Sequence, residues 1–235
     1  MKVGILKTGR PPKPAIARFG TYPDMFVQLL GPDAYDWRTY DVDGGELPKR
    51  PTDCDAYIIT GSSAGVYDPE PWIQPTMDFL RAAQGQAALV GVCFGHQLMA
   101  QAFGGQVIKS PKGWGVGEQE YEVMRREPWM GDPPLRIRLP ASHQDQVVAL
   151  PPGAEVLVAN EFAPFAGLVW PGEKAISMQP HPEFEPAYAK SLIEHRRGDP
   201  YPDEQADAAI ASYSGADDRM LVAGWIKNFL ARATP

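Results

Sequence analysis

The sequence predicts an α/β fold with a mostly parallel central sheet and flanking helices, and three observations indicate it. Short β-rich runs alternate with helical patterns through the first half of the chain, which is typical of strands joined by crossover helices. Residues 87–92 form a nearly continuous apolar run, as expected for a strand buried on both faces of a parallel sheet. The 235 residues include 25 prolines spread along the chain, without a linker or a repeat, which favours one domain over residues 1–235.

The first half supplies the parallel strands and their helices. Residues 3–6 form the first predicted strand, and residues 24–30 form a helix that follows Pro23 and stops at Gly31-Pro32. Further along, the pattern predicts strands at 37–42, 56–60 and 87–92 and a helix at 72–83. The strand at 56–60 ends in a Gly- and Ser-rich loop at 61–65, at the sheet edge where α/β proteins place functional groups.

The second half changes character. Short strand-like runs punctuated by Pro and Gly predict antiparallel additions to the sheet, at 119–124, 135–139, 147–150, 155–158, 167–170 and 175–178. After residue 183 the pattern turns helical, at 186–197, 202–213 and 217–232. We expect the last helix to pack on the core through its apolar side chains at near-helical spacing, which are Met220, Leu221, Ile226, Phe229 and Leu230.

Composition excludes several classes of protein. The formal net charge of −7 argues against a general nucleic-acid binder, because phosphate contacts need an excess of Lys and Arg. The longest uncharged apolar run, near residues 87–94, is far shorter than the ~20 residues that span a bilayer, and no export signal is visible. Cys54 and Cys93 cannot form a disulfide framework, and zinc-binding spacings are absent. We therefore expect a cytoplasmic protein without membrane, nucleic-acid or metal binding.

The segment most informative about chemistry follows the buried strand at 87–92. The chain there reads Gly91-Val92-Cys93-Phe94-Gly95 and continues in a helical pattern, which is the nucleophile-elbow pattern with Cys in place of Ser. The glycines permit a tight turn that exposes the thiol, and the N–H groups at the helix start favour a thiolate. An isolated Cys is more often a buried core residue, but this context favours a nucleophile at Cys93.

A thiolate nucleophile needs a base and a group that orients the base. Of the four histidines, His181 is the best candidate, because prolines on both sides favour an extended backbone in which Glu183 points the same way as the imidazole. His96 lies on the elbow helix and does not face the thiol, and His195 lies at a solvated helix end. Taken alone, the segment at 179–183 could equally be a polar turn.

Acyl transfer through a tetrahedral intermediate also needs hydrogen-bond donors for the oxyanion. The backbone N–H of Phe94 directly follows the candidate nucleophile. The loop at Gly61 and Ser62 ends a neighbouring strand and is the second candidate, with an ordinary strand-to-helix connection as the alternative.

The segment at 91–97, Gly-Val-Cys-Phe-Gly-His-Gln, followed by His-Pro-Glu at 181–183, resembles the class I, triad-type glutamine amidotransferase domain over roughly residues 40–190. The resemblance implies a flavodoxin-like sheet, and the predicted helices at about 196–235 form a C-terminal extension beyond the family core. The resemblance also implies that Cys93 is the nucleophile, His181 the general base, Glu183 the orienting acid and Gln97 a contact to the substrate.

Two further segments carry the resemblance less closely. The loop at Gly61 lies where the family places its oxyanion Gly, but it reads Gly-Ser-Ser-Ala-Gly instead of the common Gly-Gly-Pro. Residues 142–147, Ser-His-Gln-Asp-Gln-Val, resemble a segment of the γ-glutamyl-peptidase-like branch and of GMP synthetase amidotransferase domains. This similarity makes His143 a candidate substrate contact, and a polar loop before a strand is the alternative.

The resemblance implies attack on a γ-carboxamide through a γ-glutamyl thioester at Cys93. No phosphate-binding or dinucleotide-binding motif is visible, so we expect no cofactor. Three functions stay open: a stand-alone hydrolase of glutamine or a small γ-glutamyl amine or peptide, a glutaminase subunit that supplies ammonia to a separate synthase partner, and an idle binding or regulatory protein. The intact set of reacting residues disfavours the third, and the C-terminal helices favour the first because they would cover a stand-alone domain.

Overall fold

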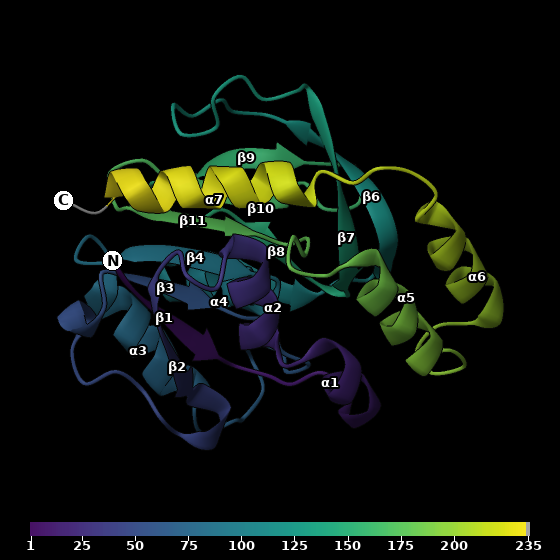
Figure 1. Ribbon diagram of the computed structural model, residues 1–235, viewed down its shortest axis with the longest axis horizontal. Helices are drawn as coiled ribbons and strands as arrows, with labels where there is room; N and C mark the ends of the chain where they lie inside the picture. The colour runs from purple at the N-terminus through teal and green to yellow at the C-terminus, as the bar shows by residue number, and fades with distance from the viewer. Residues whose placement is uncertain (234–235) are drawn as a thin grey trace.

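A nine-stranded sheet forms the centre of the computed structural model, which describes residues 1–233 (Figure 1). The strand order is β2-β1-β3-β4-β11-β10-β9-β6-β7. The last two residues of the predicted C-terminal extension lie outside the described residues.

Five parallel strands make up one half of this sheet, namely β1 (Lys2–Lys7), β2 (Asp36–Asp41), β3 (Ala56–Ile59), β4 (Ala88–Val92) and β11 (Ala175–Met178). Their order, β2-β1-β3-β4-β11, with parallel pairing throughout, is the 2-1-3-4-5 order of flavodoxin-like sheets. The predicted α/β fold class is confirmed. Every residue of β4 is buried, which explains its continuous apolar sequence.

Helices cover both faces of the parallel half. Helices α2 (Tyr22–Leu30) and α7 (Arg219–Ala233) pack on one face, and in Figure 1 α7 lies in front of the sheet and runs alongside β11. Helices α3 (Ile73–Ala83) and α4 (Phe94–Ala102) pack on the other. Two short 3-10 turns, η1 (Val42–Gly44) and η2 (Pro51–Asp53), lie between β2 and β3. No helix among the described residues is both long and apolar enough to cross a bilayer.

Four further strands extend the sheet by antiparallel pairing: β10 (Gly167–Trp170), β9 (Glu155–Ala159), β6 (Gly115–Val123) and β7 (Arg136–His143). The predicted antiparallel additions at 119–124, 135–139, 155–158 and 167–170 are thus confirmed. The strand at 175–178 was expected among them, and this expectation is wrong: β11 returns beside the buried strand β4, pairs with it in parallel, and is antiparallel only to β10. β8 (Asp145–Ala149) differs, because it pairs with β5 (Gln106–Lys109) in a separate two-stranded sheet. The sequence pattern predicts no strand where β5 lies, and its strand at 135–139 stops four residues before the end of β7 at His143.

Helices α5 (Pro186–His195) and α6 (Asp203–Ser212) lie beside the far end of the antiparallel half (Figure 1). In α7, the expectation that Met220 and Leu221 pack on the core is wrong, since they are 64% and 36% exposed. The buried stripe of α7 repeats at helical spacing along the opposite side; it consists of Val222, Ala223, Trp225, Ile226, Phe229 and Leu230.

Prolines conceal the starts of the first two helices. Helix α1 (Lys13–Phe19), for which the pattern gave no expectation, has a proline in its first turn. Helix α2 begins at Tyr22, one residue before Pro23, and Thr21 and Asp24 form a capping box at its start. Proline is compatible with the first turn, because the N–H groups there have no intrahelical acceptor.

Candidate active site

Three loops meet at the carboxyl edge of the parallel sheet. Gly61 lies just beyond β3, Cys93 directly follows β4, and His181 lies just beyond β11, so the strand order places Cys93 between the other two. A Cβ atom built on Gly61 would lie 3.3 Å from His181 Cε1 and 3.7 Å from Cys93 Cβ. The structure therefore brings Cys93 and His181 together beside Gly61.

Cys93 occupies a tight turn between β4 and α4. Its φ of 53° and ψ of −107° lie in a region that non-glycine residues rarely adopt, at a cost of about 1–3 kcal/mol. A Cβ on Gly91 would lie 2.5 Å from the Gly95 carbonyl oxygen, and one on Gly95 would lie 2.3 Å from the Ile59 carbonyl oxygen. Both flanking positions therefore require glycine, which is the physical reason for the Gly-x-Cys-x-Gly pattern.

The imidazole of His181 is fixed on several sides. Its Nδ1 lies 2.7 Å from Glu183 Oε1, and both side chains are almost fully buried. The ring stacks on Phe184 with centroids 3.8 Å apart and an interplanar angle of 7°, and the backbone N–H of His181 donates to the Pro140 carbonyl at 2.8 Å. Since Glu183 occupies Nδ1, the other ring nitrogen, Nε2, is the one available to Cys93.

The two histidines near the thiol differ in charge. Burial lowers the pKa of His181, but the Glu183 carboxylate and the Cys93 side chain outweigh it and raise that pKa to about 10. Burial lowers the pKa of His143 to about 4, against a weaker opposing effect of its hydrogen bond to the Asp145 backbone. At neutral pH His181 is therefore cationic and can stabilise a thiolate at Cys93, whereas His143 is neutral.

The other two histidines lie outside this arrangement. His96 is fully buried and its Nδ1 lies 2.8 Å from Ser177 Oγ. Burial, with a smaller contribution from His143, lowers the pKa of His96 to about 3, so it is a neutral core residue. His195 is exposed at the end of α5.

A polar cavity of about 280 Å³ opens at Cys93. Gln97, His143 and Ser62 all line it. The Gln97 amide donates to the Asp145 carbonyl at 2.9 Å and to Gln179 Oε1 at 3.0 Å, so this side chain ties α4 to β8 at the cavity wall. The cavity also has charged and aromatic lining residues that the sequence did not single out, namely Tyr67, Asp68, Lys109, Trp114, Asp145 and Arg196.

Candidate oxyanion donors lie on two sides of Cys93. Phe94 is the first residue of α4, so its N–H has no intrahelical acceptor. Its ring packs on Trp72 with centroids 5.4 Å apart, which fixes the start of the helix. Gly61 contacts Cys93 from the side of β3, and Ser62 lines the same cavity. Within residues 1–233, no group of His, Cys, Asp and Glu side chains is arranged to hold a metal ion.

The part of the chain that forms this site matches a known protein family. The family model described as glutamine amidotransferase class-I matches residues 37–196, more than half of the chain. The chain belongs to this family. The match contains Gly61, Cys93, His143 and His181, and it ends at Arg196, close to the end of α5.

The chain is similar to proteins of three kinds. The chain is 29% identical to a glutamine amidotransferase-like protein of Schizosaccharomyces pombe over 97% of this chain and 98% of that protein. It is 32% identical to γ-glutamyl peptidase 4 of Arabidopsis thaliana over 61% of each chain. It is 29% identical to a glutamine-hydrolysing GMP synthase of Thermomicrobium roseum, over 69% of this chain but only 30% of that protein.

A solved structure shows the same fold. A glutamine amidotransferase of Thermotoga maritima superposes with a TM-score of 0.74 at 20% sequence identity, covering 99% of this chain and 97% of that one. The flavodoxin-like sheet with its antiparallel extension is therefore an arrangement that this glutamine amidotransferase shares.

The cavity residues that the sequence did not indicate come from distant segments. Tyr67 and Asp68 follow β3, Lys109 ends β5, Trp114 precedes β6, and Arg196 follows α5. Tyr67 donates its hydroxyl proton to Asp145 Oδ2 at 2.8 Å across the cavity. No spacing in the sequence joins these positions. Only the resemblance at 142–147 pointed to this wall of the cavity. It named His143 as a candidate contact and included Asp145 without assigning it a role.

Proposed function

We propose that this amidotransferase-family chain is a stand-alone hydrolase of γ-glutamyl compounds, with Cys93 as the nucleophile. The observation that carries the proposal is that Cys93, which lines a polar cavity, interacts with the buried His181–Glu183 pair. A nucleophile, a base and an orienting carboxylate in this order form the arrangement that acyl transfer requires.

In the proposed reaction, the Cys93 thiolate attacks the γ-carbonyl carbon and forms a carbon–sulfur bond. The N–H of Phe94 and the Gly61–Ser62 loop donate to the oxyanion that develops on the carbonyl oxygen. His181 gives its proton to the leaving nitrogen as the carbon–nitrogen bond breaks. Neutral His181 then takes a proton from water, which attacks the γ-glutamyl thioester and releases glutamate and the thiolate.

The charges of the cavity fit a zwitterionic amino acid. Lys109 and Arg196 supply positive charge, and Asp68 and Asp145 supply negative charge. A γ-glutamyl group carries an α-ammonium and an α-carboxylate, and a peptide leaving group adds a second carboxylate. Two cationic side chains therefore favour a γ-glutamyl peptide over free glutamine. The similarity to a γ-glutamyl peptidase of Arabidopsis thaliana supports this substrate class.

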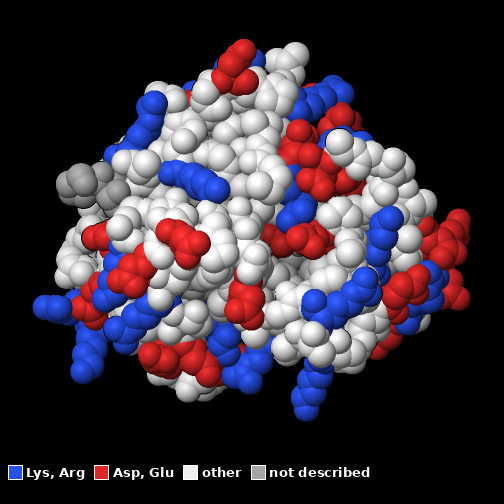
Figure 2. Space-filling model, viewed as in Figure 1, with Lys and Arg blue, Asp and Glu red and all other residues white. Residues whose placement is uncertain are grey.

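The cover of the cavity supports a stand-alone enzyme. Trp114 and Arg196 form part of the wall, and the Arg196 guanidinium carbon lies 5.6 Å from the Trp114 ring centroid. The Tyr201 hydroxyl, just before α6, lies 3.3 Å from Arg196 Nη1. Segments of this chain therefore close a side that a partner could otherwise cover. On the face in Figure 2, acidic and basic side chains are interspersed.

The second candidate is a glutaminase subunit that supplies ammonia to a separate synthase. The similarity to GMP synthase favours it, because that relative is named for hydrolysing glutamine and contains a large part that this chain does not match. The full-length match to the Schizosaccharomyces pombe protein favours the stand-alone hydrolase. An idle binding protein is the third candidate, and the buried ion pair beside Cys93 is the observation against it.

The deciding experiment incubates the purified chain with glutamine, γ-glutamyl amines and γ-glutamyl dipeptides and measures released glutamate by chromatography. We expect turnover on the order of 1 s⁻¹ or above for a γ-glutamyl dipeptide without any partner. Cys93→Ala is the control for contaminating activity. Negligible release that rises on adding cell extract would favour the glutaminase subunit, and negligible release under both conditions would favour the binding protein.

A further inference from the structure

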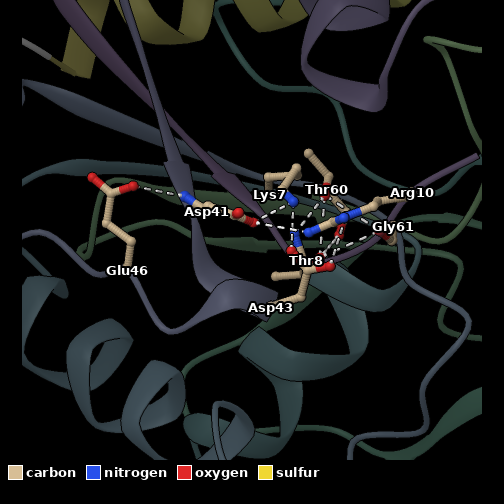
Figure 3. A network of polar contacts seen from close by, with 8 residues as sticks. All are labelled: Lys7, Thr8, Arg10, Asp41, Asp43, Glu46, Thr60 and Gly61. Carbon is tan, nitrogen blue, oxygen red and sulfur yellow. Dashed lines mark hydrogen bonds and ion pairs between the residues drawn. The ribbon is translucent and has the colours of Figure 1, made fainter. Parts of the chain in front are cut away.

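A second polar network lies behind the Gly61 loop, outside the cavity (Figure 3). It joins the carboxyl ends of β1, β2 and β3 through two buried threonines, Thr8 and Thr60, and a group of ion pairs. The proposed reaction uses none of these side chains directly. They lie beside Gly61, a candidate oxyanion donor, so they can affect how that loop is oriented towards Cys93.

The two threonines hold two successive carbonyl groups. The Thr8 N–H donates to Thr60 Oγ1 at 3.0 Å, and the Thr8 hydroxyl donates to the Thr60 carbonyl at 2.9 Å. The Thr60 hydroxyl donates to the Gly61 carbonyl at 3.2 Å, and Thr8 Oγ1 lies 3.3 Å from that same oxygen. Both threonines are at most 1% exposed, so water does not compete for these hydrogen bonds.

The direction of the Gly61 carbonyl determines the direction of the next N–H group. In a trans peptide the C=O of one residue and the N–H of the following residue point to opposite sides. β1 lies on one side of β3 and β4 lies on the other. Because the Gly61 carbonyl is held on the side of Thr8, which follows β1, the Ser62 N–H points to the side of Cys93, which follows β4.

We propose that Thr8 and Thr60 are positioning residues that hold the Gly61–Ser62 peptide with its N–H directed at the oxyanion formed during acyl transfer to Cys93. This inference rests on the proposed function. The opposite orientation of the peptide would present a carbonyl oxygen to the developing negative charge and would raise the barrier instead of lowering it. A donor aimed in advance is the source of oxyanion stabilisation in enzymes.

Ion pairs fix the segment that carries Thr8. The neighbouring Lys7 is 8% exposed and is paired with Asp41 and, at 2.7 Å, with Asp43. Arg10 also pairs with Asp43, at 3.3 Å. Thr8 is therefore held to the end of β2 on one side and to Thr60 on the other, as Figure 3 shows. Contacts within this chain therefore hold the Gly61–Ser62 loop in place, as a stand-alone hydrolase requires.

The test removes the hydroxyl groups and keeps the side-chain volume. The double variant Thr8→Val/Thr60→Val should lower kcat for a γ-glutamyl dipeptide by ~10²-fold, since loss of one oxyanion donor has this scale, with KM changed only a few-fold. Thr8→Ser/Thr60→Ser retains both hydroxyls and should restore most of the rate. Thr76→Val is the matched control, because Thr76 is also fully buried and donates to a backbone carbonyl, that of Trp72, at 2.6 Å.

Two reagents that react with Cys93 distinguish loss of the positioned oxyanion donor from a general loss of thiol reactivity. p-Nitrophenyl acetate acylates the thiolate through a tetrahedral intermediate and releases p-nitrophenolate, whereas iodoacetamide alkylates it at a saturated carbon, with loss of iodide and no oxyanion. The double valine variant should show a ratio of acylation rate to alkylation rate at least 10-fold below that of the wild type. An unchanged ratio, or an equal loss of both rates, would overturn the inference.

This ratio needs no γ-glutamyl substrate. If the wild type hydrolysed no γ-glutamyl compound and the ratio still fell in the double valine variant, the proposed function would be wrong while the positioning role would stand. If the wild type hydrolysed γ-glutamyl peptides and the ratio did not change, the positioning role alone would be wrong.

Discussion

The two halves of the sheet contribute different parts of the candidate site. The parallel half, β2-β1-β3-β4-β11, carries Gly61, Cys93 and His181 at the ends of three adjacent strands. The antiparallel half and the segments that follow it carry cavity walls, including Trp114, His143 and Arg196. The proposed reacting groups thus come from the regular part of the fold, whereas its additions supply part of the cavity wall.

This difference follows from how each half positions a side chain. Parallel strands end at a common edge, so short loops from neighbouring strands meet without a long excursion of the chain. The antiparallel additions reach the cavity through segments at their ends, at Trp114 and at residues 142–145. We infer that changes in the parallel half act mainly on kcat and that changes in the additions act mainly on KM. The following predictions test that division, from the largest effect to the smallest.

Cys93→Ala should abolish hydrolysis, because no other side chain can form the thioester. The glutamine analogue diazo-oxo-norleucine should add covalently to Cys93 and spare Cys54, which is 3% exposed and lies 3.6 Å from the Tyr40 hydroxyl. Intact-mass measurement and peptide mapping give the site of addition. A label on Cys54, or no label on either cysteine, would contradict the assignment of the nucleophile.

His181→Ala should lower kcat by ~10²-fold or more, which is the usual scale for a positioned general base. Glu183→Gln should cost less, since the imidazole remains but loses the carboxylate at its Nδ1. Steady-state kinetics with a γ-glutamyl dipeptide measures both, and His195→Ala, at an exposed position, is the control. If His181→Ala kept a rate within a few-fold of the wild type, the base would lie elsewhere, with His143 as the next candidate.

Arg196→Met should raise KM for a γ-glutamyl dipeptide about 10-fold, because one charge-assisted hydrogen bond contributes on the order of 1.5–3 kcal/mol. The kcat value should stay within a few-fold of the wild type, since Arg196 lies on the added wall. Comparison with glutamine, which lacks the carboxylate of the leaving group, gives the matched control substrate. A fall in kcat with unchanged KM would contradict the inference that the additions act mainly on KM.

The smallest effect concerns stability. Because the pKa of His181 is raised from 6.5 to about 10 in the folded chain, its ionic interactions stabilise the fold fully below pH 6.5 and lose that contribution as the pH rises towards 10. Glu183→Gln should therefore lower the melting temperature more at pH 6.5 than at pH 10. Thermal unfolding of both proteins at the two pH values measures this, and an equal decrease at both would argue against a charged His181.

An element could be predicted from the sequence when the contacts that form it join residues close together in the chain. The elbow at 91–95 could be predicted because the glycines that permit the turn are two residues from Cys93 in the chain. β5 and the end of β7 at His143 were not readable, because β5 pairs with a strand distant in sequence and His143 belongs to a strand with a polar end. In α7, the apolar Met220 and Leu221 fit the expected spacing but face away from the sheet.

By itself, the sequence determined the first four parallel strands, the strained turn at Cys93 and the pairing of His181 with Glu183, but not that β11 joins the parallel half. These features depend on residues close together in the chain, through apolar runs, glycine spacing and the two-residue period of extended backbone. Only the tertiary structure decided which side chains surround the cavity and how Thr8 and Thr60 hold the Gly61 carbonyl. Most of those contacts join segments far apart in the chain, as between Thr8 and Thr60 with a separation of 52, and no local pattern encodes which distant strands become neighbours.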